Sequence, residues 1–193
     1  MIYWFKSLPE KIIYDKELFP VVKNKWLRKN MVGLGTALAL IIIIANPFKI
    51  TDFVLRRFAN DGLNVSINIV LMAAFIIFAF LFVIIGHEFL HILAVYGKDD
   101  MSVTLSLWGI FVITNAELSK MRWLIFISLP LIILTILPLI ISFLLPYDIA
   151  GLLRYFAVFN LGVSSLDIIN TINIIFKPQN AIFWRGLYYL PNK

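Results

Sequence analysis

Two histidines four residues apart carry the clearest chemical signal in this chain of 193 residues. His87 and His91 enclose Glu88 in the segment His-Glu-Phe-Leu-His, and no other histidine occurs in the sequence. On a helix, residues at this spacing share a face with Cβ atoms about 5 to 6 Å apart, so both imidazoles can bind one Zn²⁺ at roughly 2.0 to 2.1 Å. Glu88 lies one residue further around the helix, where it can take a proton from water. The pattern predicts a zinc hydrolase with Glu88 as a catalytic residue.

A third zinc ligand is expected elsewhere in the chain, because a catalytic site usually has three protein ligands and one open position. Asp167 is the best candidate, since it is the only carboxylate in the apolar stretch from Leu152 to Phe176. A carboxylate within a membrane costs about 2.5 to 3.5 kcal/mol on insertion scales unless a partner compensates it, and zinc would do so. Glu117 is the next candidate. A haem held by both histidines is disfavoured, because side chains four apart on one helix cannot occupy opposite axial positions.

Asn160, Ser164, Asp167 and Thr171 form a polar stripe on one face of the same stretch, at positions i, i+4, i+7 and i+11. For Ser164 and Thr171 we expect ordinary hydrogen bonding between membrane helices. Asn160 has two interpretations. It is either a catalytic residue that donates to the oxyanion of a tetrahedral intermediate, or a residue that bonds a neighbouring helix.

The composition indicates that these residues belong to a membrane protein. The chain is 61% hydrophobic and 15% charged, and its apolar residues occur in long runs. Alternating residues from Met101 to Thr114 are typical of a β-hairpin. The expected fold is an all-α membrane protein of about four transmembrane helices, with this small hairpin between the second and third. The expected spans are Met31 to Phe48, Val65 to Tyr96, Trp123 to Leu145 and Leu152 to Phe176.

The chain divides into a basic cytosolic N-terminal segment, residues 1–30, and a single transmembrane domain, residues 31–193, whose core is about 65–176. The 17 Lys and Arg residues lie between apolar runs rather than in one patch, which favours membrane orientation over nucleic-acid binding. If the N-terminus lies in the cytosol, only four of these Lys and Arg residues lie on the outer side of the membrane. These four are Lys49, Arg56, Arg57 and Arg154. Because Lys and Arg are enriched in cytosolic loops, both termini are expected in the cytosol. The absence of cysteine excludes disulfides and thiolate ligands.

Three segments resemble a known family. They are the His-Glu-Phe-Leu-His segment, the basic Ser-Lys-Met-Arg segment that follows the hairpin, and the stretch from Asn160 to Asp167. This combination resembles the small bacterial membrane proteins called putative zincin peptidases, which are similar to site-2 proteases that cleave inside the bilayer. The resemblance covers roughly Val65 to Phe176. One departure is Ile168, where site-2 proteases usually have glycine.

The resemblance implies that His87, His91 and Asp167 bind zinc and that Glu88 is the general base. The predicted function is an intramembrane zinc metalloprotease of the bacterial plasma membrane, acting on membrane-embedded or membrane-proximal proteins or peptides. The hairpin would either pair with an unwound substrate strand or cap the helices. The alternative function is a non-catalytic zinc-containing membrane binding or immunity protein. Glu88 argues against that alternative, because a structural zinc site does not need a carboxylate beside its histidine.

Overall fold

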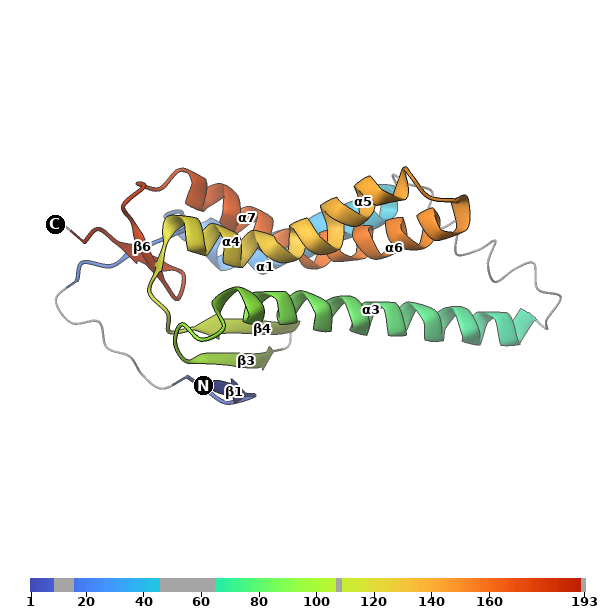
Figure 1. Ribbon diagram of the computed structural model, residues 1–193, viewed down its shortest axis with the longest axis horizontal. Helices are drawn as coiled ribbons and strands as arrows, with labels where there is room; N and C mark the ends of the chain where they lie inside the picture. The colour runs from blue at the N-terminus through green and yellow to red at the C-terminus, as the bar shows by residue number, and fades with distance from the viewer. Residues whose placement is uncertain (9–15, 46–64, 107–108, 192–193) are drawn as a thin grey trace.

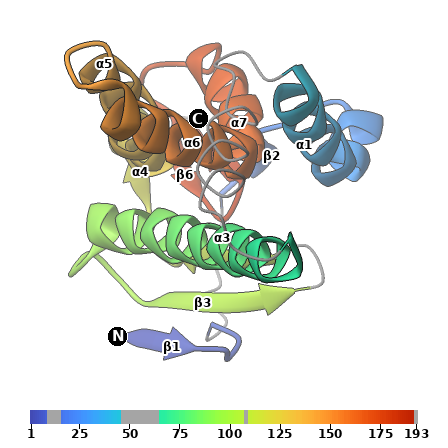
Figure 2. The same cartoon turned by 90° about the vertical axis from the view of Figure 1, so that its right-hand side faces the viewer.

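The computed structural model describes residues 1–8, 16–45, 65–106 and 109–191 (Figure 1). Its helices are α1 (Lys25–Ala45), α3 (Val65–Val95), α4 (Lys120–Leu131), α5 (Leu137–Ser142), α6 (Tyr147–Val163) and α7 (Ser165–Ile175), with a π-helix, η1 (Ile132–Ile136), between α4 and α5. The end-on view in Figure 2 shows α3 between a small sheet on one side and the other helices on the opposite side. The site described below lies where α3 meets α4, α7 and the sheet.

Helix α3 is the longest element, with 31 residues and no proline. Its sequence is apolar all round, which is typical of a helix in lipid rather than of an amphipathic surface helix. Large side chains along it remain exposed, including Ile77, Phe78, Phe82 and Phe89. Only 17% of its apolar window is buried inside the protein, so most of this surface is available to lipid.

Two helices of the described chain, Val70–Val95 and Lys120–Ser142, are long and apolar enough to cross a membrane. The α6–α7 pair makes a third if it counts as one span, although it is bent by 61°. These findings support a membrane protein but do not confirm four spans. The end of the expected first span, from Asn46 to Phe48, lies outside the described residues, as do Lys49, Arg56 and Arg57.

The expected last span, Leu152 to Phe176, consists of two helices. The first begins at Tyr147, and a break at Ser164 separates it from the second. The polar stripe predicted for one helix is therefore divided between α6 and α7. A periodic sequence pattern cannot reveal the break, because Ser164 bends the chain with ordinary backbone angles, φ −74° and ψ 2°. In Figure 1, α3 and the α6–α7 pair run in the same direction, as expected for the second and last spans.

The expected hairpin is present as β3 (Met101–Ser106) and β4 (Gly109–Thr114), with Met101 opposite Thr114. The predicted mainly helical fold is found, but the prediction that this hairpin is the only β-structure is not confirmed, because the described residues form two sheets. Strand β1 (Ile2–Trp4) pairs in parallel with β3. The second sheet has the order β2-β7-β6-β5, formed by β2 (Phe19–Pro20), β7 (Leu187–Tyr189), β6 (Ile182–Trp184) and β5 (Leu118–Ser119). Strands of two or three residues are too short to show alternation in the sequence.

The main hydrophobic core lies at the end of the molecule that carries the sheets. It joins Val95 of α3, Met101 of β3, Trp123 of α4 and Phe183 of β6, all nearly inaccessible to solvent. The rings of Trp123 and Phe183 stack with centroids 5.9 Å apart. This core fixes the C-terminal end of α3 against the start of α4, and the two histidines of α3 lie just beside it.

Candidate metal centre

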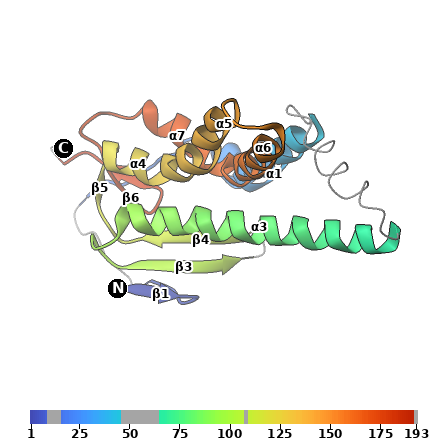
Figure 3. The same cartoon turned by 45° about the vertical axis from the view of Figure 1, so that its right-hand side comes forward.

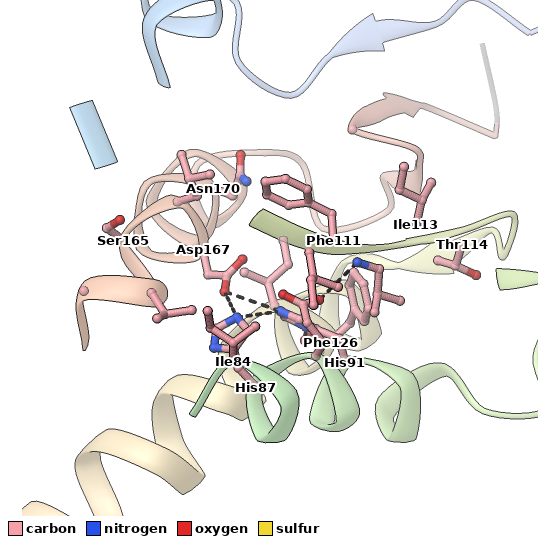
Figure 4. Close-up of a pocket in the computed structure, with 18 of the residues that line it drawn as sticks. Ile84, His87, His91, Phe111, Ile113, Thr114, Phe126, Ser165, Asp167 and Asn170 are labelled. Carbon is pink, nitrogen blue, oxygen red and sulfur yellow. Dashed lines mark hydrogen bonds and ion pairs between the residues drawn. The ribbon is translucent and has the colours of Figure 1, made fainter. Parts of the chain in front are cut away.

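The two histidines and Asp167 meet between α3 and α7 (Figure 4). The Nε2 atoms of His87 and His91 are 3.2 Å apart, and both face Oδ2 of Asp167, at 3.0 and 3.4 Å respectively. In a tetrahedral zinc site with bonds near 2.0 to 2.1 Å, neighbouring ligand atoms lie about 3.3 Å apart. The three residues predicted as ligands are therefore brought together at the spacing that zinc requires.

The hydrogen bonds behind the histidines set which nitrogen carries the proton. Nδ1 of His91 faces the backbone oxygen of Phe126 at 2.7 Å, and a carbonyl only accepts. Nδ1 of His87 faces Oδ1 of Asn160 at 3.0 Å. Both rings therefore donate from Nδ1 and present the lone pair of Nε2 to Asp167. Three acceptors converge in a buried site, which is unfavourable unless a cation lies among them, so the donor set fits a metal ion.

Asn160 is fully buried and lies behind His87. Its Nδ2 donates toward the backbone oxygen of Pro130 at 3.1 Å, Oγ1 of Thr135 at 2.9 Å and Oγ of Ser164 at 3.1 Å. These acceptors occupy its N–H groups, so they point away from the metal ligands. Asn160 thus links α6 with α4, η1 and His87, which agrees with the helix-bonding interpretation.

Pro130 was not recognised as a contributor to the site from sequence. Proline has no N–H, so in α4 it cannot make the helical hydrogen bond to the carbonyl of residue 126. That carbonyl is the group that accepts from His91, and the carbonyl of Pro130 itself accepts from Asn160. The signal was available, since a proline inside a membrane helix always leaves a carbonyl four residues earlier without its usual donor.

Glu88 follows His87 but points toward the sheet. Its Oε2 accepts a hydrogen bond of 3.1 Å from the backbone N–H of Val112 in β4, and the residue is only 8% exposed. His87, Glu88 and Asp167 line one cavity of about 810 Å³. The carboxylate therefore shares the cavity with the three candidate ligands and is not part of the group that could hold a metal.

Asp167 lies in the first turn of α7, directly after the bend at Ser164. A carboxylate is stabilised there by the positive end of the helix dipole, so Ile168 does not prevent the expected placement of this ligand. Glu117, the alternative ligand, lies elsewhere. Its Oε2 pairs with Lys16 at 3.0 Å and accepts a hydrogen bond from the Tyr189 hydroxyl.

The described geometry agrees with a comparison to known protein families. Residues 79–182, more than half of the chain, match the model of the family described as "Putative zincin peptidase". No curated protein and no solved structure matches the chain. The matched range contains His87, Glu88, His91 and Asp167, and a zincin family implies the metal that the three ligand atoms fit. The chain belongs to the putative zincin peptidase family.

Proposed function

We propose that this membrane protein is a zinc metalloprotease that hydrolyses peptide bonds within or next to the bilayer, with Glu88 as general base. The observation that carries the proposal is the convergence of His87, His91 and Asp167 beside Glu88 in one cavity. A structural zinc site is normally closed by four protein ligands. Among the described residues only three potential ligands converge here, which suits a site that leaves a position for the reaction.

Each residue of the site has a distinct role in this proposal. His87, His91 and Asp167 would hold zinc, which would supply a Lewis acid for the substrate carbonyl and for water. Glu88 accepts the proton from the attacking water at its carboxylate and delivers it to the nitrogen of the leaving amine. Asn160 and the carbonyl of Phe126 hold the two imidazoles in the tautomer that leaves Nε2 free.

The surroundings of the site support a substrate that is a peptide segment of a membrane protein. The cavity is walled by apolar groups of α3, α4 and β4, including Ile84, Phe126 and Phe111 (Figure 4). A volume near 810 Å³ falls in the range of clefts that enclose a drug-sized ligand, roughly 300 to 1,000 Å³. The exposed apolar surface of α3 next to this cavity supports a site beside lipid.

The test is Glu88→Gln, which keeps the size of the side chain and removes the basic carboxylate. Purified protein in nanodiscs is assayed for bound zinc and for cleavage of a library of labelled transmembrane peptides. We expect unchanged zinc and a loss of cleavage by a factor of at least about 10². Glu117→Gln is the matched control and should keep both. Wild-type protein that binds zinc but cleaves no peptide would favour the non-catalytic binding function instead.

We also propose that both termini and the segment from Gly97 to Arg122 face the cytosol of a bacterial cell, with the metal site toward that side. The support is the distribution of Lys and Arg among the loops. Single cysteines introduced at Lys98 and Lys120 should react with an impermeant thiol reagent only after the membrane is permeabilised. A cysteine at Arg154 should react in intact cells. The reverse pattern would invert the orientation.

A further inference from the structure

Strands β6 and β7 bring a basic side chain to the cavity of the metal centre. Trp184 pairs with Leu187, so this hairpin turns within two residues, Arg185 and Gly186. Figure 3 shows β6 beside α4, at the end of the molecule that carries the sheets. Both turn residues line the cavity that contains Glu88 and the candidate metal ligands. Among the described residues that line this cavity, Arg185 is the only Lys or Arg.

The backbone of Arg185 has an unusual conformation for a residue with a long side chain. Its φ is 45°, and that of Gly186 is 77°. Two consecutive residues with positive φ are typical of a type I′ turn, in which Asn-Gly is preferred because both residues tolerate the left-handed region. An arginine at the first position is strained, and strain of this kind is concentrated at functional sites. The conformation therefore indicates a role for the side chain rather than for the turn.

The surroundings of Arg185 fix the turn and orient the guanidinium group. The carbonyl of Gly186 accepts a hydrogen bond of 3.1 Å from the N–H of Val21, a residue that is only 3% exposed. The guanidinium carbon Cζ lies over the ring of Trp184, 5.2 Å from its centre. This contact uses the face of the guanidinium and leaves its edge for hydrogen bonds. With five N–H donors, the group can bind a carboxylate through two parallel bonds and keep another partner.

The neighbours of Arg185 complete a corner that suits the end of an apolar peptide. Asn170 lines the same cavity and follows Asp167 by three residues on α7, so the two share a face of the helix. Its amide is a second donor for a carboxylate. Arg185 and Asn170 also line a smaller cavity of about 290 Å³. The apolar walls of this smaller cavity include Val21, Val22, Trp123, Ile127, Ile174 and Leu187.

We propose that Arg185 binds a carboxylate of the substrate, so that the metal centre acts on peptides that bring a free carboxylate into its cavity. This carboxylate is either the C-terminal group of a peptide or an Asp or Glu side chain, because both present the same pair of oxygens. A carboxylate among apolar groups needs a compensating partner, and Arg185 supplies it. The smaller cavity accepts the apolar part of the adjoining residue.

Arg185 is a specificity-determining residue in this proposal and takes no part in proton transfer. Water still adds across the C–N bond of the peptide, and Glu88 still moves the proton. The consequence for cleavage rests on the proposed function, whereas the binding of a carboxylate at Arg185 does not.

Binding is measured by fluorescence anisotropy with zinc-loaded Glu88→Gln protein in nanodiscs of neutral lipid, which keeps a bound peptide intact. The probes are short fluorescein-labelled peptides of Ala and Leu, with either a free C-terminal carboxylate or a C-terminal amide. A third probe has a C-terminal amide and Glu as its last residue, so the set distinguishes the two sources of a carboxylate. We expect at least one carboxylate probe to bind at least about tenfold more tightly than the neutral amide.

Arg185→Asn removes the guanidinium and introduces the residue that a type I′ turn prefers. It should abolish the preference for a carboxylate and leave the affinity for the neutral amide unchanged. The temperature of thermal unfolding should rise by about 2 to 4 °C, because the strain at this position is relieved. A lower unfolding temperature with the preference retained would show that Arg185 serves only the fold, and would overturn the proposal.

Two further variants separate the shape of the guanidinium from its charge. Arg185→Lys keeps the charge without the planar edge and should keep only part of the preference. Arg122→Gln is the matched control, since Arg122 is exposed and does not line the cavity. It should keep the preference in full.

Equal binding of the carboxylate and amide probes would overturn the proposal, as would a preference that survives Arg185→Asn. A preference that survives this substitution and disappears when a chelator removes zinc would place the carboxylate on the metal instead. Wild-type protein that cleaves all three probes at equal rates would refute the specificity and leave the protease function intact. A preference that depends on Arg185 without any cleavage would refute the protease activity and leave the carboxylate site intact.

Discussion

Two polar clusters in the described part of this apolar protein differ in how their charges are satisfied. The metal centre is enclosed by helices, and His87 is 3% and His91 6% exposed. The second cluster joins Lys16, Glu117 and Tyr189 where the second sheet meets the start of the chain. The side chains of Lys16 and Glu117 are 37% and 29% exposed, so water shares in their solvation.

The difference in exposure between the two clusters indicates which polar residues of an apolar chain belong to a functional site. Within the helices no water replaces a lost partner, and the groups behind the two imidazoles, Asn160 and the carbonyl of Phe126, each have an assigned partner. At the sheets a carboxylate can pair with a lysine and remain partly hydrated. Burial therefore distinguishes Asp167 from Glu117, although both are acidic residues near polar neighbours in the sequence.

Removal of a carboxylate from each cluster gives the largest expected contrast. Asp167→Ala should abolish stoichiometric zinc binding, because two histidines alone leave an incomplete shell. Glu117→Ala should retain all of the zinc. Metal analysis of both purified variants, with circular dichroism to confirm that they are folded, measures this. Full zinc in Asp167→Ala protein would show that the third ligand is another residue.

The sequence predicted the group of residues that could hold a metal better than the elements that carry it. His87 and His91 could be recognised because their spacing is local, and Asp167 because a lone carboxylate in a span needs a partner. The break at Ser164, the short strands at both ends of the chain and the partner of the carbonyl that Pro130 leaves free could not be recognised in the same way. Each depends on contacts between segments distant in sequence, which no periodicity encodes.

Asn160→Ala should have the next largest effect within the metal centre. It removes the acceptor of the His87 Nδ1–H and should weaken zinc binding by about 10- to 100-fold, as measured by competition with a chelator. Asn173→Ala is the control, because Asn173 bonds only the backbone of its own helix among the contacts described. If Asn160 acts on an oxyanion instead, its replacement will leave zinc affinity unchanged and lower the rate of cleavage by about 10²- to 10³-fold.

Pro130→Ala should weaken zinc binding by about tenfold, at the lower end of effects for groups that support metal ligands. Alanine restores the N–H that can bond the carbonyl of Phe126, and this donor competes with His91. The helix itself gains a hydrogen bond, so thermal stability without zinc should not fall.

Pro138→Ala restores an N–H near the start of α5, where its acceptor would be a backbone carbonyl of η1 rather than the carbonyl that accepts from His91. It should leave zinc affinity unchanged. If Pro130→Ala and Pro138→Ala weakened zinc binding equally, proline would act through the general shape of this span rather than through the Phe126 carbonyl.

The smallest effect is expected from the exposed cluster and depends on pH. Hydrogen bonds to Tyr189 and Glu117 raise the pKa of Lys16 above its ordinary 10.5, while burial and the bond to Glu117 raise the pKa of Tyr189 above 10.0. Folding thus favours the protonated form of both groups. Their contribution to stability is complete below these ordinary values and is lost as pH rises through the higher values of the folded protein.

Glu117→Gln should therefore lower the free energy of unfolding by less than about 1 kcal/mol at neutral pH, because solvent screens a pair this exposed. The difference from wild type should persist to about pH 9 and shrink above about pH 10.5, where Lys16 and Tyr189 lose their protons in the wild type. Thermal unfolding in detergent at a series of pH values measures it, with zinc content as the internal control. A difference that grows with pH, or a loss of zinc, would mean that this cluster is coupled to the metal centre and that the two do not behave independently.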